Sequence, residues 1–190
     1  MRLIELTPID SIDDTQGWQG YKQYYVKPAE IKRQNNLALI RSYDPKWRSY
    51  NYGWFDLSNL PKSSKYHKMP INSRSPFPYL KLSANLSLNE KEHGYTVEVI
   101  GVEPNYRGMG LAPSLYEAAL TDLDMPIISD SKQTSAGSAL WVKFFKNPKY
   151  LVKAINVDTG ETGKAYLENN KLAGDLDISE HQMRFTLELA

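Results

Sequence analysis

The chain has 190 residues, with 23 Lys and Arg against 22 Asp and Glu, a formal net charge of +1. This length can bury the core of one domain, and the small charge provides no global field to attract nucleic acid or a membrane surface. The absence of cysteine excludes disulfides, thiolate catalysis and cysteine-ligated zinc.

The start of the chain gives no sign of export. Residues 1–14 carry acidic side chains and no apolar stretch of the kind that forms a secretory signal. No apolar run in the sequence approaches the roughly 20 residues that a membrane helix needs. We therefore expect a cytoplasmic protein with no membrane partner.

The first half of the chain, residues 1–95, is polar and rich in aromatic residues. Residues 26–32 contain Pro28 and predict a short helix, whereas residues 36–42 and 50–57 predict strands. Four prolines and many polar residues over 61–78 predict a long loop. The alternation of apolar and polar residues over 79–88 predicts a half-buried strand.

The signals become sharper after residue 95. Residues 95–102 are apolar and β-branched and predict a strand, which Pro104 ends. A glycine-containing turn over 105–111 leads into a predicted helix over 112–123, whose first turn contains Pro113. Apolar residues at helical spacing form its expected core face, namely Leu111, Leu115, Ala119 and Leu123.

The rest of the chain alternates between strands and a helix. A second helix is predicted over 134–146, and its expected core residues are Ala139, Leu140, Phe144 and Phe145. Strands are predicted over residues 126–128, 150–158, 165–168 and 183–189. No internal repeat and no second domain are visible, so we expect one domain over residues 1–190. The order of strands and helices indicates an α/β or α+β sandwich with a mixed sheet.

The turn between the predicted strand and helix carries the chemistry. Gly108 and Gly110 let the backbone curl and let a ligand approach closely, and the following helix start offers free N–H groups to an anion. Arg107 adds a positive charge. Two other interpretations are a plain turn without a ligand and a dinucleotide-binding loop. Pro113 argues against a dinucleotide-binding loop, because it occupies the position of the third glycine in such a loop.

The wider context of this turn resembles a known family. The strand ends in Val102-Glu-Pro104, and the Arg/Gln-x-x-Gly-x-Gly/Ala pattern is met by Arg107, Gly110 and Ala112. The segment is similar to motif A of the GNAT superfamily of N-acetyltransferases, and the similarity covers residues 95–158. It implies a GNAT-like fold, with a mixed, mostly antiparallel sheet flanked by helices, and an acetyl-coenzyme A-dependent N-acetyltransferase.

The resemblance also implies where coenzyme A binds. The main-chain N–H groups that hold its pyrophosphate would be those of Arg107, Gly108, Met109, Gly110, Leu111 and Ala112. Ser114 would add a hydroxyl contact. The pantetheine arm would lie along the strand where it separates from residues 126–129, with N–H groups near Ile100 and Val102 facing the thioester carbonyl. Thr134 and Trp141 keep the family spacing at the second helix.

Direct attack by an amine needs a base, and the family often places a carboxylate on the strand before motif A. Glu98, four residues before Val102, matches that position, and His93 is an alternative base. The family's usual tyrosine acid corresponds to Trp141, which cannot donate a proton at neutral pH. Another group, such as Tyr150, Ser138 or water, could protonate the departing thiolate, or the thiolate could leave without a proton. Alternatively, the protein binds coenzyme A without turnover. That last case would make the chain a silent binding or inhibitory protein of the same fold.

The acceptor is not named by the sequence. By the resemblance, residues 1–95 form the acceptor side, 95–158 the coenzyme A-binding core and 159–190 the last strands. We expect an amine-bearing small molecule or protein. No metal is expected, because the three histidines are far apart in the sequence. Basic and aromatic side chains mingle over residues 18–68, which we interpret as the wall of the acceptor cleft rather than a nucleic-acid site. Residues 127–134, followed by Leu140-Trp141, resemble acetyltransferase-like proteins of bacteriophages.

Overall fold

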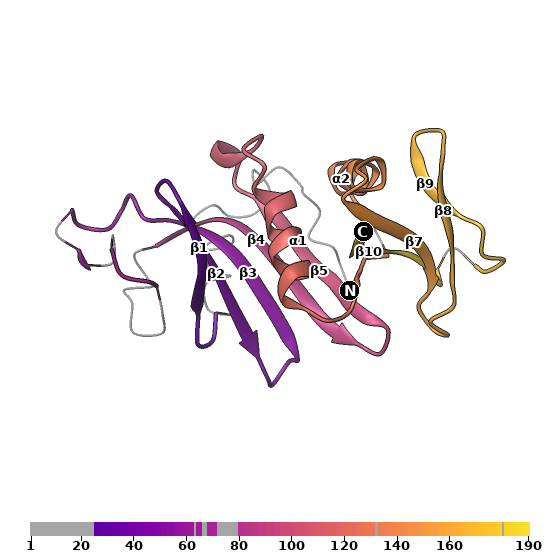
Figure 1. Cartoon of the computed structure of the whole chain (residues 1–190), viewed down its shortest axis with the longest axis horizontal. Helices are drawn as coiled ribbons and strands as arrows, with labels where there is room; N and C mark the ends of the chain where they lie inside the picture. The colour runs from indigo at the N-terminus through magenta and orange to yellow at the C-terminus, as the bar shows by residue number, and fades with distance from the viewer. Residues whose placement is uncertain (1–24, 63, 66–67, 72–79, 132, 180) are drawn as a thin grey trace. The chain divides into compact units, whose positions relative to one another are not determined.

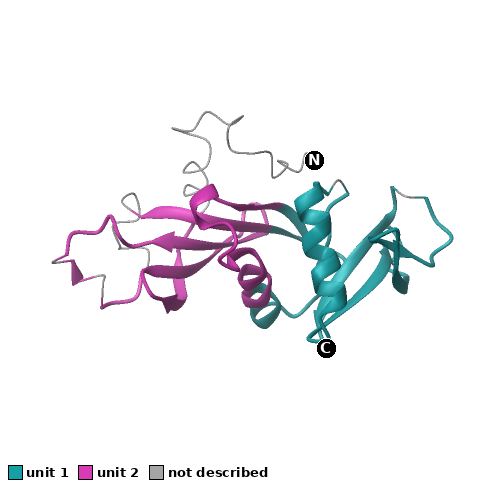
Figure 2. Ribbon diagram, turned by 90° about the horizontal axis from the view of Figure 1, so that it is seen from above, with its two compact units in different colours: residues 1–6, 88–98, 119–190 teal, residues 7–87, 99–118 magenta. Residues whose placement is uncertain are grey.

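A computed structural model describes residues 25–62, 64–65, 68–71, 80–131, 133–179 and 181–190. The acidic start of the chain and the aromatic residues before Tyr25 lie outside these ranges. The contacts within the chain divide it into two compact units, which Figure 2 shows in separate colours. Unit 1 contains residues 1–6, 88–98 and 119–190, and unit 2 contains residues 7–87 and 99–118.

Unit 2 is built on neighbouring antiparallel strands (Figure 1). They are β1 (Ala29–Gln34), β2 (Leu37–Asp44) and β3 (Ser49–Asp56), followed in the sheet order by parts of β4 (Lys81–Lys91) and β5 (Gly94–Val102). The first eight residues of α1 (Leu111–Asp122) also belong to this unit. Leu111, Leu115 and Ala119 are buried, as their helical spacing predicted, whereas Leu123 is half-buried.

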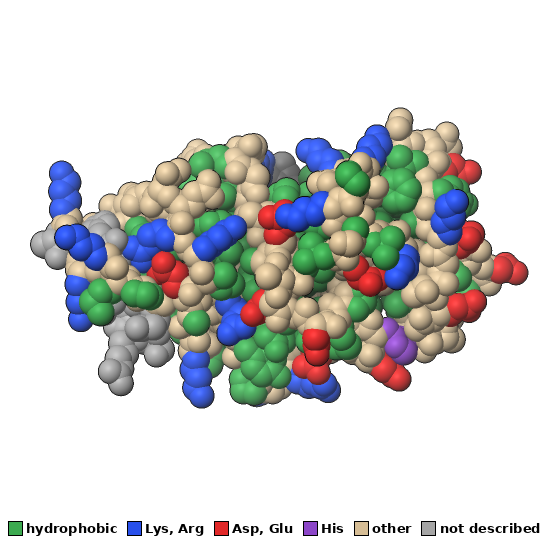
Figure 3. Space-filling model, viewed as in Figure 1, with side chains coloured by type: hydrophobic (Ala, Val, Ile, Leu, Met, Phe, Trp, Pro, Cys, Tyr) green, Lys and Arg blue, Asp and Glu red, His purple; other side chains and the backbone are tan. Residues whose placement is uncertain are grey.

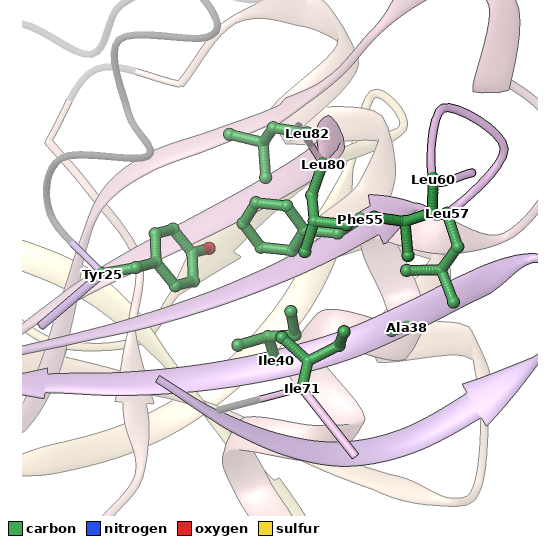
Figure 4. Packing of buried hydrophobic residues seen from close by; sticks show 9 residues of the cluster. All are labelled: Tyr25, Ala38, Ile40, Phe55, Leu57, Leu60, Ile71, Leu80 and Leu82. Carbon is green, nitrogen blue, oxygen red and sulfur yellow. The ribbon is translucent and has the colours of Figure 1, made fainter. Parts of the chain in front are cut away.

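The core of unit 2 lies against one face of β2 and β3. Because successive side chains of a strand point to opposite faces, Ala38 and Ile40 share a face, and Phe55 lies opposite Ala38 on β3. Figure 4 shows Tyr25 directed at Phe55, and the two rings meet edge-on at 5.0 Å between centroids. The buried Tyr25 hydroxyl donates a hydrogen bond of 2.7 Å to Asn85, which satisfies its polar group inside an apolar core.

Unit 1 contains the rest of the sheet. Its strands follow the order β5, β6 (Ile127–Ile128), β10 (Met183–Leu189), β7 (Tyr150–Asn156), β8 (Thr162–Glu168) and β9 (Lys171–Gly174). The β5–β6 pair is parallel, and the pairs that β10, β7, β8 and β9 form are antiparallel. The helix α2 (Ser135–Lys146) belongs to this unit, with Trp141 and Phe144 buried. The expected class is confirmed: an α+β fold with a mixed, mostly antiparallel sheet and two helices.

Two predictions about elements are wrong. Residues 26–32 do not form a helix; β1 occupies most of them and pairs with β2 through the turn at Asn35, whose φ is +52°. The edge strand β9 was missed, although Asn169 and Asn170, with φ of +50° and +60°, form the kind of two-residue turn that favours a hairpin.

The predicted core face of α2 is also partly wrong. Phe144 is buried, but Ala139 is exposed, and Leu140 and Phe145 are half-buried. Trp141 is buried instead, and its ring meets that of Phe144 edge-on. Neither described helix is both long and apolar enough to cross a membrane.

Candidate functional site

The turn between β5 and α1 is anchored by polar contacts on three sides. It begins with a short 3-10 helix, Pro104–Tyr106. The Tyr106 hydroxyl donates a hydrogen bond of 2.5 Å to Asp56 at the end of β3, and the Glu103 N–H donates to the Ser83 carbonyl at 2.9 Å. Lys81 forms a 2.5 Å ion pair with Glu103. These contacts fix the point at which the chain enters the glycine-containing turn.

The anchor between Tyr106 and Asp56 has a clear electrostatic signature. Burial alone would raise the pKa of Asp56, but the hydrogen bonds it accepts from Tyr106 and Ser58 outweigh burial and lower that pKa. Burial, together with the hydrogen bond to Asp56, raises the pKa of Tyr106 to about 12. Tyr106 therefore remains a neutral donor, and Asp56 an ionised acceptor, throughout the neutral range.

The glycines of the turn leave open space above the backbone. Gly108 and Gly110 have φ of +78° and +74°, the left-handed region that favours glycine, and a Cβ at either position would meet no heavy atom within 4 Å. The N–H groups of Gly108, Gly110, Leu111 and Ala112 have no hydrogen-bond partner among the described residues. Several free donors at the start of a twelve-residue helix can bind an anion.

Two side chains predicted to assist this site have defined contacts. Arg107 is exposed, and its Nε lies 3.4 Å from the Val102 carbonyl oxygen. The Ser114 hydroxyl accepts a hydrogen bond from the buried Trp54 indole and donates one to the Leu111 carbonyl, both at 2.7 Å. Ser114 thus connects the first turn of α1 to β3. It stays a prediction that a ligand contacts Arg107, Met109 and Ser114.

The parallel pairing of β5 is short. Tyr95 pairs with Ile127 and Thr96 with Ile128, where the two-residue strand β6 ends, whereas β5 continues to Val102. The separation from residues 126–129 and the place of the pantetheine arm stay predictions. An extended ligand can pair with main-chain groups that a strand leaves free. The roles expected for the N–H groups of Ile100 and Val102 stay predictions.

Glu98 lines a cavity of about 410 Å³ that lies within unit 1. The cavity is formed by the end of β4, the start of β5, the end of β6 and part of β10. Its lining includes Asn89, Thr96, Glu98, Ile128, Asp130 and Arg184. Asn89 donates a hydrogen bond to the Glu98 carboxylate. Burial raises the pKa of Glu98, the charge of Asp130 raises it further, and the charge of Lys91 opposes this shift.

This environment gives Glu98 the properties of a general base. A carboxylate with a raised pKa binds a proton more strongly than an exposed one, as a general base requires. His93, the alternative base, also lines the cavity. The structure thus brings both sequence candidates to one cavity. Their catalytic roles stay predictions.

Three other predicted residues lie away from this cavity. Trp141 is buried and meets Phe144 edge-on at 6.1 Å, and Tyr150 packs against the same ring at 5.1 Å. Neither side chain is among those lining the cavity. Thr134 is the N-cap of α2, where its hydroxyl accepts the Gly137 N–H at 3.0 Å. The part of the chain that the structure describes contains no group of three His, Asp or Glu that could hold a metal ion.

Several site residues were not found from the sequence. Asn89 and Glu98 face each other across the β4–β5 hairpin, and the turn between the predicted strands could have indicated this pair. Asp130 directly follows a short buried strand, a position where polar residues often reach a sheet edge. Arg184 comes from β10, more than 50 residues later, and no local pattern predicts its place in the cavity.

Comparisons with known proteins find a loose structural likeness. No protein-family model and no curated protein matches the sequence. A solved structure described as an acetyltransferase of the GNAT family, from Bacteroides thetaiotaomicron, is similar with a TM-score of 0.37 and 14% sequence identity. The match covers 77% of this chain, and it spans 65% of the length of that protein. A likeness this loose carries no argument about what the chain does.

Proposed function

We propose that this protein is an N-acetyltransferase that transfers the acetyl group of acetyl-coenzyme A to an amine. The observation that carries the proposal is the turn at Gly108 and Gly110, with its free N–H groups at the start of α1. These donors suit the two linked phosphates of coenzyme A, and the missing side chains leave room for them. The resemblance of the same residues to motif A supports the assignment.

The distribution of charge between the units supports the same assignment. Unit 2 contains 13 Lys and Arg against 8 Asp and Glu, whereas unit 1 contains 10 against 14. Figure 3 shows Lys and Arg side chains gathered over β1–β3 of unit 2, and Asp and Glu side chains over β8 and β9 of unit 1. The basic unit attracts the phosphates of coenzyme A, and the acidic unit attracts a protonated amine.

In the proposed reaction Glu98 prepares the nucleophile. An ammonium acceptor gives one proton to the Glu98 carboxylate and becomes a neutral amine. Its nitrogen then forms a bond to the carbonyl carbon of the thioester, and the carbon–sulfur bond breaks. The nitrogen loses a second proton, the departing thiolate takes up one, and one proton in all is released to solvent. No protein nucleophile is needed, which agrees with a chain without cysteine.

A binding experiment tests the pyrophosphate site. Coenzyme A should raise the melting temperature of the wild type, because a ligand that binds only the folded state stabilises it. Gly110→Glu should abolish this shift. Gly110→Ala is the matched control, since it carries the same backbone strain at φ +74° without the negative charge. A folded Gly110→Glu protein with the wild-type coenzyme A shift would contradict the proposal.

A second candidate is a coenzyme A-binding protein without turnover. It is favoured by Trp141, which is buried against Phe144 at the position where the family usually has an acidic hydroxyl. The two candidates differ in one measurement, the release of free thiol from acetyl-coenzyme A in the presence of a broad panel of amines. Bound coenzyme A without thiol release would favour the silent protein, whereas rapid release with any amine would exclude it.

A further inference from the structure

The hydroxyl of Ser114 forms two hydrogen bonds within the protein, one as a donor and one as an acceptor. It donates to the Leu111 carbonyl and accepts from the indole N–H of Trp54, both at 2.7 Å. A serine hydroxyl has a single proton to donate. While the bond to Leu111 lasts, Ser114 therefore has no proton for a bound phosphate, and its hydroxyl acts on the protein instead.

Ser114 fixes two peptide groups at the start of α1. Its main-chain N–H donates to the Gly110 carbonyl at 3.2 Å, and its hydroxyl donates to the Leu111 carbonyl. In a planar trans peptide, the carbonyl and the N–H that follows it point in opposite directions. Holding these two carbonyls toward Ser114 therefore directs the N–H groups of Leu111 and Ala112 the other way, out of the helix start. Both are donors without a hydrogen-bond partner in the described part of the chain.

Trp54 holds the Ser114 side chain from outside the helix. It lies on β3, 60 residues before Ser114, and is only 1% exposed. A buried indole N–H without a partner is costly, so the fold favours the Ser114 rotamer that accepts it. The Lys32 ammonium lies 5.5 Å from the centroid of the Trp54 ring, and this cation–π contact restricts the indole further. The orientation of Ser114 thus depends on a side chain of another element.

We propose that Trp54 is a positioning residue for coenzyme A, which acts through Ser114 to direct the N–H groups of Leu111 and Ala112 at the pyrophosphate. This inference rests on the proposed function, which supplies coenzyme A as the ligand. It differs from the direct contact between Ser114 and the ligand that the resemblance to motif A implies. Trp54, Ser114 and the turn all belong to unit 2.

Calorimetric titration of coenzyme A tests the chain of hydrogen bonds. Trp54→Phe should weaken binding about 3- to 10-fold, the size of one neutral hydrogen bond. Ser114→Ala should weaken it at least as much, whereas Ser114→Thr keeps a hydroxyl that can reach the preceding turn and should stay within about twofold of the wild type. The double variant should bind no more weakly than Ser114→Ala, because both changes break one chain. Losses that multiply, or a Trp54→Phe protein with the wild-type affinity, would overturn the inference.

Two further variants separate positioning from packing. Leu39 is fully buried and pairs with Trp54 across β2 and β3, so Leu39→Val should lower the melting temperature but keep the coenzyme A affinity within about twofold. Replacing Trp54 with benzothienylalanine puts sulfur in place of the indole N–H in a ring of the same shape, and it should weaken binding as Trp54→Phe does. Equal weakening by Leu39→Val, or no weakening by the sulfur analogue, would overturn the inference.

Kinetics and a second ligand separate this inference from the proposed function. Trp54→Phe should raise the KM for acetyl-coenzyme A and leave kcat within about twofold, because the residue acts on binding and not on the reacting atoms. Inorganic pyrophosphate should also bind the wild type more tightly than Trp54→Phe. If both ligands show this difference in binding but no amine is acetylated, the role of Trp54 stands and acetyl transfer fails. If amines are acetylated but both proteins bind coenzyme A equally, acetyl transfer stands and the role of Trp54 fails.

Discussion

Glu98 occupies a position that disfavours its own ionised form. Its half-buried carboxylate has a raised pKa, so folding favours the protonated acid. The stabilising contribution of such a group is complete below the pKa of the unfolded chain and is lost as pH rises through the folded pKa. Wherever the side chain is ionised, it therefore reduces the stability of unit 1.

Replacing Glu98 should separate stability from activity. Glu98→Gln keeps an oxygen that can accept the Asn89 hydrogen bond but removes the charge, so its melting temperature at pH 7 should equal or exceed that of the wild type. Any gain should disappear as the pH falls below the pKa of the unfolded chain, because Glu98 is then protonated in both the folded and the unfolded state. Acetyl transfer should fall about 10²- to 10⁴-fold at neutral pH.

The control for this variant is Glu168→Gln, which removes an equal charge from an exposed position on β8. It should keep the wild-type rate. Thermal unfolding at pH 7 and pH 4, together with rates of thiol release, provides the measurements. A Glu98→Gln protein that melts at a lower temperature than the wild type at pH 7, or acetylates at the wild-type rate, would exclude this account of Glu98.

At the scale of elements, the turn before α1 depends on contacts between segments that are distant in the sequence. Tyr106 reaches Asp56, 50 residues earlier, and Glu103 reaches both Lys81 and Ser83. The sequence predicted the strand, the turn and the helix here, because each has a local signature in Pro104, Gly108 or the helical spacing of the leucines. It did not predict the anchor, because pairing between distant polar residues leaves no local pattern.

Removing the anchor should loosen the turn. Tyr106→Phe deletes the hydroxyl that donates to Asp56 and leaves a partly exposed carboxylate without this donor, which should cost about 1–2 kcal/mol of unfolding free energy. Coenzyme A binding should weaken as well, because the free N–H groups would be less fixed. Chemical denaturation and coenzyme A titration measure the two effects.

Tyr43→Phe is the matched control for this variant. Its ring packs against Tyr50 at 4.5 Å, and its hydroxyl has no hydrogen bond among the described residues. It should therefore change the unfolding free energy by less than about 0.5 kcal/mol. Equal effects of the two substitutions would mean that the contact between Tyr106 and Asp56 contributes nothing to the turn.

The errors in the predicted elements have a similar physical cause. Pro28 suggested a helix start, but residues 29–34 gain the main-chain hydrogen bonds of pairing with β2, and such tertiary contacts outweigh local propensity. In α2, Trp141 is buried in place of Ala139 and Leu140, which were expected in the core. The neighbouring elements decide which face of a helix is buried, and the sequence of the helix alone does not show them. Element type was therefore more predictable than burial.

For the molecule as a whole, the net charge of +1 conceals a separation of charge. The sequence alone could not reveal it, because each unit is assembled from separate segments of the chain. Glu103 and Glu117 belong to the basic unit 2, whereas Glu98, five residues before Glu103, belongs to the acidic unit 1. Counting charges along the chain therefore missed a property that becomes visible only after folding.

This separation predicts that coenzyme A binding depends on salt. Raising ionic strength from about 0.05 M to 0.5 M shortens the Debye length below roughly 5 Å, so the affinity should fall several-fold. Arg107→Gln should reduce both the affinity and its dependence on salt. Lys171→Gln, which removes one cation from an exposed position on β9 in unit 1, should leave both unchanged. An affinity that does not vary with salt would mean that charge contributes little.

The position of β10 also has a consequence for synthesis and folding. This strand, residues 183–189, comes last in the chain order of the strands but lies between β6 and β7 in the sheet of unit 1. Until it emerges from the ribosome, the facing edges of β6 and β7 have no partner, and unpaired strand edges invite association with other chains. The sheet of unit 1 can therefore be completed only after translation has passed residue 189, whereas β1, β2 and β3 of unit 2 can pair as soon as they are made.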